Sequence, residues 1–255
     1  KIPMPVTSQH PQDAPELAVR SWKELEGYTD IPTDGQLSPT KIRQLRHGYY
    51  ACVSYADAMV GCLLDELERL ELSQNTVVVL WGDHGFHLSE QGLWTKANNY
   101  ELSTRVPLII SVPGQVKPGA KTDALVEFVD LYPTLAEICG LDAPVGVDGI
   151  SFKPLLEEPE MSWKQAVFSQ YPRAREGNRH RGHGDIMGYA VRTARYRYVE
   201  WRQWQTGRVV ARELYDHEQD PNEMRNVAKR PEEAHIVRRL AGLLKNNHEP
   251  AAPGE

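Results

Sequence analysis

The sequence predicts an α/β protein with a small antiparallel α+β subdomain at its C-terminal end, and three observations support this prediction. Two apolar runs, residues 77–80 and residues 107–112, have the length and composition of strands buried in a parallel sheet. Helical patterns alternate with these runs, as is typical of parallel α/β folds. From about residue 165 onward, short alternating strand patterns replace them. We therefore expect two domains, residues 1–160 and residues 161–255.

The first part of the chain predicts a surface segment followed by one long helix. Residues 1–40 are rich in Pro and polar side chains without a clear period, which is typical of an irregular surface segment. Ser38 suits a helix N-cap, and Pro39 suits the first helical position. Apolar residues then recur at helical spacing, so we expect a helix over residues 39–72 whose apolar stripe packs on the sheet.

The later elements follow from shorter patterns. A helix is expected around residues 133–139, because Gly140 has the character of a helix end. A final helix is expected over residues 231–245. The strands of the C-terminal subdomain share an alternating pattern and are expected over residues 188–193, 196–201 and 212–215.

Composition excludes two classes of function. The chain of 255 residues has a net charge of −6, which argues against a general nucleic-acid-binding protein. No apolar run approaches the ~20 residues that a membrane-spanning helix requires. The cysteines lack the spacing of a metal site and are interpreted as buried free thiols: Cys52, Cys62 and Cys139.

The candidate site follows the first predicted strand directly. Asp83 and His84 lie between two glycines in the run Trp-Gly-Asp-His-Gly. Ligands of open α/β sheets bind beyond the carboxyl ends of the strands, and glycine lets a backbone approach closely. A carboxylate is a hard oxygen ligand that suits a divalent cation. The alternative interpretation, a strand-to-turn junction made by Asp and Gly, stays open for this short segment.

Several separated segments resemble those of type I sulfatases. Residues 82–96 are similar to the family's D-H-G segment, which continues as L-G-E-H-G and W-x-K. Residues 41–61 resemble the helix before that strand. Residues 213–228 resemble the C-terminal signature E-L-Y-D, D-P-x-E and N-L-A. The segments most similar to iduronate-2-sulfatases are residues 169–173 and 186–193.

This resemblance implies a partial alkaline-phosphatase-like parallel-sheet sandwich in residues 1–160 and the activity of a sulfuric ester hydrolase acting on a sulfated sugar or another sulfate ester. Asp83 and His84 are implied as metal ligands, with Ca²⁺ as the expected ion and Mg²⁺ as the alternative. Imidazole is an unusual partner for Ca²⁺, so His84 is also a candidate catalytic group that hydrogen-bonds the sulfate or its leaving oxygen. Lys96 matches the family's sulfate-binding lysine and is a candidate catalytic and substrate-binding residue. The family also implies an extracytoplasmic location: periplasmic, lysosomal or secreted.

The chain departs from the family in one informative way. Type I sulfatases use a formylglycine made from Cys or Ser within C/S-x-P/A-x-R, and no Cys or Ser of this chain has that context. The family's paired Asp-Asp, central Lys and two His are missing too. These elements normally precede the segments matched here. We therefore expect the C-terminal half of a sulfatase, whose partner is the N-terminal half of the same enzyme and which is inactive alone.

Basic residues crowd one glycine-containing stretch of the C-terminal subdomain. Arginine suits the geometry of a sulfate group, so Arg173 and Arg181 are candidate contacts to a sulfated sugar. A solvated polar loop is the alternative.

Two other functions stay open. One is a phosphate-ester hydrolase or mutase of the same superfamily, which shares the D-H-G strand end but is disfavoured by the C-terminal signature. The other is a non-catalytic remnant that binds anionic glycans. The nucleophile distinguishes the first from a sulfatase, and binding without hydrolysis would indicate the second.

Overall fold

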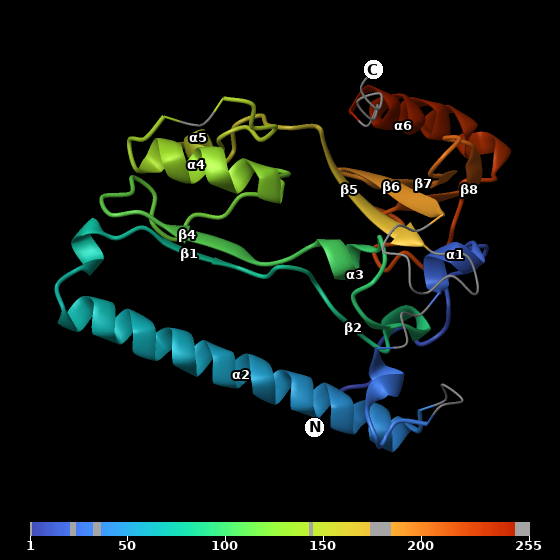
Figure 1. Ribbon diagram of the computed structural model, residues 1–255, viewed down its shortest axis with the longest axis horizontal. Coiled ribbons are helices and arrows are strands. Elements are labelled where there is room, and N and C mark those ends of the chain that lie inside the picture. Colours follow the sequence, from blue (N-terminus) through green and yellow to red (C-terminus); the bar gives the residue numbers. More distant parts are fainter. Residues whose placement is uncertain (1, 21–23, 33–36, 143–144, 174–184, 248–255) are drawn as a thin grey trace. The chain divides into compact units, whose positions relative to one another are not determined.

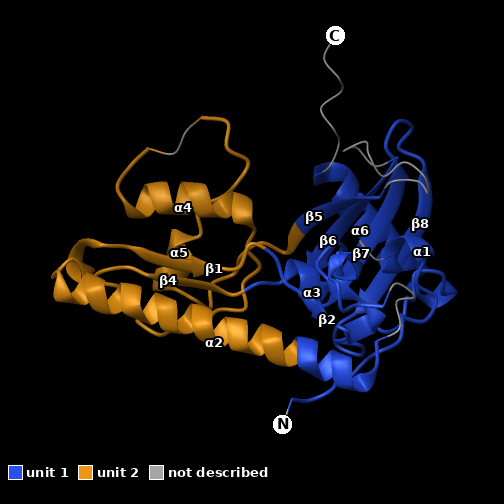
Figure 2. Cartoon of the chain, turned by 60° about the horizontal axis from the view of Figure 1, so that its bottom comes forward, with its two compact units in different colours: residues 1–45, 84–106, 168–255 blue, residues 46–83, 107–167 orange. Residues whose placement is uncertain are grey.

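The computed structural model forms two compact units, which Figure 2 shows in different colours. Unit 1 consists of residues 1–45, 84–106 and 168–255, and unit 2 consists of residues 46–83 and 107–167. The expected C-terminal subdomain is therefore joined in unit 1 by two segments that the sequence assigned to the first domain. The structure describes every residue except 1, 21–23, 33–36, 143–144, 174–184 and 248–255.

A four-stranded sheet of order β5-β6-β7-β8 forms the framework of unit 1 (Figure 1). The pairs β6–β7 and β7–β8 are antiparallel, as the alternating patterns predicted. The sequence missed the first strand, because Ser, Gln and Pro interrupt its apolar pattern. The strands are β5 (Ala166–Arg173), β6 (Ile186–Thr193), β7 (Tyr196–Gln203) and β8 (Val209–Asp216).

Both faces of this sheet are covered. Alternation along β7 places Val199 and Trp201 on one face, where they join a buried cluster with Ala18 of helix α1 (Glu16–Val19). Helix α6 (Ala234–Asn247) packs against β6 and β7 and buries Leu240 completely. The expectation that residues 1–40 form only a surface segment is therefore wrong at α1. Unit 1 is completed by η1 (Leu25–Gly27), β2 (His87–Leu88), η3 (Glu90–Gly92), β3 (Trp94–Thr95), α3 (Glu101–Thr104) and η5 (Pro231–Glu233).

Helix α2 (Pro39–Arg69) begins where the sequence predicted. The Ser38 hydroxyl accepts a hydrogen bond from the Lys41 backbone N–H at 3.2 Å, as an N-cap does. The helix runs into unit 2, whose other elements are η2 (Ser73–Asn75), β1 (Val78–Trp81), β4 (Leu108–Ser111), η4 (Phe128–Asp130), α4 (Leu131–Ile138) and α5 (Lys153–Glu157). In unit 2, the β1–β4 ribbon lies between α2 and α4 (Figures 1 and 2).

Strands β1 and β4 differ from the prediction of a parallel, fully buried sheet. They pair antiparallel with each other, and Leu80 and Ile109 stand opposite one another with 42% and 58% of their surface exposed. The apolar stripe of α2 is not a buried core either, because Arg46 is the buried residue of that helix. The strands are too short to cover this stripe. Helix α2 is roughly 46 Å long at 1.5 Å per residue, whereas a four-residue strand spans only about 13 Å. The three cysteines are free and exposed rather than buried.

Among the described residues, no helix combines the length and the apolar character that crossing a bilayer requires.

Candidate anion and metal site

Asp83 stands directly beyond the end of β1, at the last position of its segment of unit 2. The neighbouring Gly82 N–H donates to the carbonyl of Pro107 at 3.2 Å, which extends the contact between the two strands by one residue. The Asp83 side chain is exposed rather than packed among apolar groups. An exposed carboxylate at a strand end fits an oxygen ligand for a hard divalent cation.

His84 opens the next segment of unit 1 and is also exposed. Its Nδ1 lies 2.9 Å from the carbonyl oxygen of Gly85. Because a carbonyl oxygen can only accept, Nδ1 carries the proton, and in the neutral ring Nε2 holds the lone pair. The ring therefore has the tautomer that a metal ligand or a proton acceptor requires at Nε2.

Gly85 is required by a close backbone approach. A Cβ at this position would lie 2.0 Å from the carbonyl oxygen of Leu102, and the Gly85 N–H donates to Ser103 at 2.9 Å. The glycine of the D-H-G motif thus lets the chain after the strand lie against helix α3.

Lys96 follows a hairpin of β2 and β3 whose backbone is tightly constrained. His87 pairs with Thr95, and Thr95 has a φ of 68°, which is uncommon for a β-branched residue and persists only where the surroundings enforce it. The Asn98 N–H closes a turn on the Lys96 carbonyl at 2.8 Å. The half-buried Lys96 ammonium donates to both carboxylate oxygens of Glu24, each at 3.0 Å. The side chain thus points its charge at an anionic group.

Hydrogen bonds of buried polar side chains hold this loop in place. His87 is completely buried, its Nε2 lies 3.3 Å from Asn98 Oδ1, and burial lowers its pKa. Asn98 Oδ1 also accepts from the Tyr100 N–H at 2.9 Å. Asn99 Nδ2 donates to the Gly188 carbonyl of β6 at 3.3 Å. These contacts fix the loop against the sheet of unit 1.

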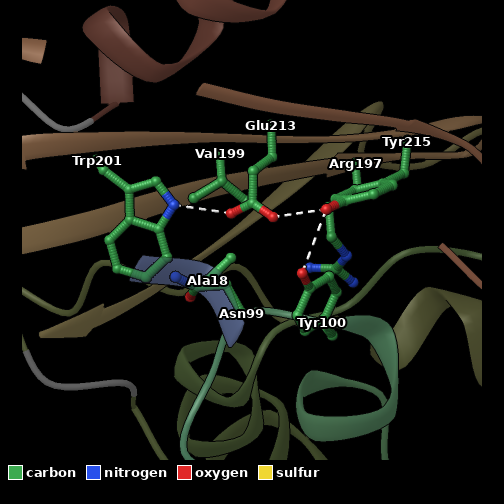
Figure 3. A pocket seen from close by; sticks show the side chains of 8 residues that line it. All are labelled: Ala18, Asn99, Tyr100, Arg197, Val199, Trp201, Glu213 and Tyr215. Atoms are coloured by element: carbon green, nitrogen blue, oxygen red, sulfur yellow. Dashed lines mark hydrogen bonds between the residues drawn. The ribbon is translucent and has the colours of Figure 1, made fainter. Parts of the chain in front are cut away.

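Hydrogen bonds around a buried carboxyl group link the sheet to the loop (Figure 3). Glu213 accepts from Trp201 Nε1 at 2.7 Å and from the Tyr215 hydroxyl at 2.6 Å, and the Tyr215 hydroxyl lies 3.3 Å from that of Tyr100. Burial raises the pKa of Glu213 to about 7. The space enclosed by these side chains is too small for a water molecule, so they form a packed core rather than a ligand pocket.

The family-like C-terminal signature proves to be a set of structural contacts. Asp216 forms a bidentate ion pair with Arg195 at 2.9 and 2.6 Å. Glu223 accepts from the buried Arg197 at 2.7 Å, and Asn226 Oδ1 accepts from the Leu214 N–H at 2.9 Å. The signature therefore stabilises the sheet on which the Lys96 loop rests.

One cluster of unit 1 contains residue types that bind metal ions, but arginines already neutralise its carboxylates. Ligand atoms of Glu101, His217 and Glu223 lie within 4.8 Å of one another. Arg197 pairs with both carboxylates, and Arg192 pairs with Glu101 at 3.0 Å. Because two guanidinium groups already balance the carboxylates, this cluster is an ion-pair network and the expected metal ligands remain Asp83 and His84.

Arg173, one of the two arginines predicted to contact a sulfated sugar, does not lie at a surface rim. Arg173 is buried, its Nε donates to the Leu17 carbonyl at 2.8 Å, and its guanidinium stacks over Trp201 at 5.5 Å. These contacts favour a structural role, which a charge count along the sequence cannot distinguish from sugar binding. Arg181 lies outside the described residues. No sequence motif pointed to Glu24, which lies in a segment expected to be irregular, 72 positions from Lys96.

Two family profiles cover most of the chain. The profile described as sulfatase matches residues 6–141, and that of the N-sulphoglucosamine sulphohydrolase C-terminal region matches residues 89–249. The chain belongs to the sulfatase family. The resemblance stated from the motifs is therefore confirmed.

Individual sulfatase relatives match over the same region. Iduronate 2-sulfatase of Mus musculus is 29% identical over 280 residues, which cover 85% of this chain and 51% of that protein. A solved structure in complex with its substrate D-glucosamine-2-N,6-O-disulfate is 29% identical with a TM-score of 0.71, and covers 84% of this chain and 43% of that one. A phosphonate monoester hydrolase of Silicibacter pomeroyi is 30% identical with a TM-score of 0.73, over 85% and 44% of the two chains.

These likenesses confirm the predicted fold class, a partial alkaline-phosphatase-like α/β fold. The chain spans about half the length of the curated relatives it matches.

Proposed function

We propose that the protein to which this chain belongs hydrolyses the sulfate ester of a sulfated sugar outside the cytoplasm. Membership of the sulfatase family and the likeness to a protein crystallised with a disulfated glucosamine support the reaction and the substrate class. The observation that carries the proposal is the Lys96 ammonium, which a constrained loop directs at two anionic oxygens.

In this proposal Lys96 binds two oxygens of the sulfate group as a point charge. His84 would either ligate the metal through the lone pair on Nε2 or, when Nε2 is protonated in the imidazolium form, donate that proton to the leaving oxygen. The nucleophile, a formylglycine in this family, belongs to the part of the protein that this chain does not span. The chain alone then binds anions without turning over the ester.

Asp83 and His84 would hold the divalent cation, with Ca²⁺ as the proposed ion and Mg²⁺ as the alternative. One carboxylate and one imidazole are fewer ligands than Ca²⁺ takes, so the other ligands would come from outside this chain. When bound, the cation supplies positive charge to the ester oxygens.

The N-terminal half of the enzyme is the proposed partner of unit 2. Large apolar side chains of α2 are exposed, among them Val53, Tyr55, Met59 and Leu63. Exposed apolar surface of this extent is typical of an interface. The N-terminal half would supply the layer that covers this surface, because the β1–β4 ribbon is too narrow to do so.

The test uses the full-length enzyme and an aryl sulfate. Lys96→Ala should lower kcat by about 10²–10³, the cost of removing one group that stabilises charge in the transition state. Lys245→Ala, a change of one exposed lysine in α6, is the control. Asp83→Asn should abolish the thermal stabilisation that added Ca²⁺ gives the wild type. Full activity of Lys96→Ala would contradict the proposed site.

A second candidate reaction is the hydrolysis of a phosphonate monoester. It is favoured by the likeness to the hydrolase of Silicibacter pomeroyi, whose TM-score of 0.73 is similar to the 0.71 of the sulfated-sugar complex. The ratio of kcat/KM for an aryl sulfate and an aryl phosphonate ester decides between them.

A further inference from the structure

Glu24 holds the Lys96 ammonium in the way that a sulfate group would. Its two carboxylate oxygens are equally distant from Nζ, at 3.0 Å each. A sulfate ester likewise presents two anionic oxygens of one group to a lysine, with the same formal charge. The pair is not a buried structural bridge, because about one third of each side chain is exposed.

The two partners differ in how firmly they are held. Lys96 follows the buried Thr95, precedes the buried Ala97 and closes a turn with Asn98. Glu24 precedes the three-residue helix η1, and its side chain caps none of the helix N–H groups. Helix η1 therefore does not require the Glu24 carboxylate, whereas the lysine position is set by the packed loop.

We propose that Glu24 is an internal competitor for the anion site at Lys96, and that an entering sulfate group displaces it. This inference rests on the proposed role of Lys96 in sulfate binding. Two anions cannot share one ammonium without repulsion, so Glu24 and sulfate exclude each other. A partly exposed ion pair is weak enough to be exchanged. Glu24 then selects for ligands that bring further contacts besides one charge.

Inorganic sulfate is the probe, added to the purified chain at constant ionic strength while the backbone amide NMR signals of Lys96 and Ala97 are followed. Glu24→Gln keeps the shape of the side chain and removes its charge. It should tighten the apparent Kd for sulfate by about two- to fivefold, the factor expected for losing one partly exposed competing pair. Glu24→Asp, which keeps the charge on a shorter side chain, should bind sulfate no more than twofold tighter than the wild type.

Glu16→Gln is the matched control for net charge, because Glu16 is exposed and pairs with Arg20 on the surface of α1. It should leave the Kd unchanged. A Glu24→Gln variant that binds sulfate as weakly as the wild type, or more weakly, overturns the inference, as does the absence of binding in every variant. If Lys96→Ala binds sulfate like the wild type, the proposed function fails as well, so the two failures are distinguishable.

Discussion

Unit 1 buries apolar side chains on both faces of its sheet, whereas unit 2 leaves the apolar side chains along α2 largely exposed. Tyr198, Trp201 and Leu240 of unit 1 are completely buried, while Leu63 of α2 in unit 2 is 70% exposed. Both units contain apolar residues at regular spacing. The difference teaches that spacing decides which side chains share a face, but that an opposing layer decides whether the face is buried.

Two ion pairs, one from each unit, differ in the same way. Arg197 and Glu223 of unit 1 form a fully buried pair, whereas Arg69 and Glu66 at the end of α2 pair on the surface. A buried charge without its partner costs far more than an exposed one. Stability should therefore be more sensitive to the buried contacts of unit 1 than to the exposed contacts of α2, and three changes test this comparison.

The largest expected effect is that of Arg197→Met. Removing this guanidinium leaves the buried Glu223 without its guanidinium partner and Glu101 with Arg192 alone, which should lower the free energy of unfolding by about 3–5 kcal/mol. Urea denaturation measures the change. Arg69→Met breaks an exposed pair and should cost less than about 1 kcal/mol. Equal effects of the two variants would contradict the comparison.

Truncating one leucine in each unit compares the two apolar layers directly. Leu240→Ala removes a completely buried side chain between α6 and the sheet and should cost about 2–5 kcal/mol. Leu63→Ala, on the exposed face of α2, should change the unfolding free energy of this chain by no more than about 0.5 kcal/mol. A large loss in Leu63→Ala would show that this face is already covered in the isolated chain.

The smallest effect of the three depends on pH. Burial raises the pKa of Glu213 to about 7 from an ordinary 4.5, so the folded state retains a proton that the unfolded state releases. The free energy of unfolding should fall by at most about 3 kcal/mol as pH rises from 4.5 to 7. Glu213→Gln, which keeps the size of the side chain and one accepting oxygen but does not titrate, should flatten this slope in pH-dependent urea melts. An unchanged slope would assign the dependence to other groups.

Glu101 gives the opposite dependence at lower pH. Burial would raise its pKa, but Arg197 and Arg192 lower it to about 2. Its stabilising contribution is present above pH 4.5 and is lost as pH falls toward 2.

The candidate site could be predicted in part from the sequence. Asp83, His84 and Lys96 lie within one short segment, so a local motif was sufficient to find them. Glu24 was missed because its contact with Lys96 spans 72 positions and involves no motif. Arg173 was interpreted as a substrate contact because charge in a sequence carries no information on burial.

The sequence by itself determined the family, the N-cap of α2, the alternating strands of the C-terminal sheet and the order of the site motifs, because these depend on neighbouring residues and short periods. Only the tertiary structure decided that β1 and β4 pair antiparallel, that the α2 stripe is exposed and that an acid from the first segment faces the sulfate-binding lysine candidate. These features depend on which distant segments meet, and a local pattern does not encode that choice.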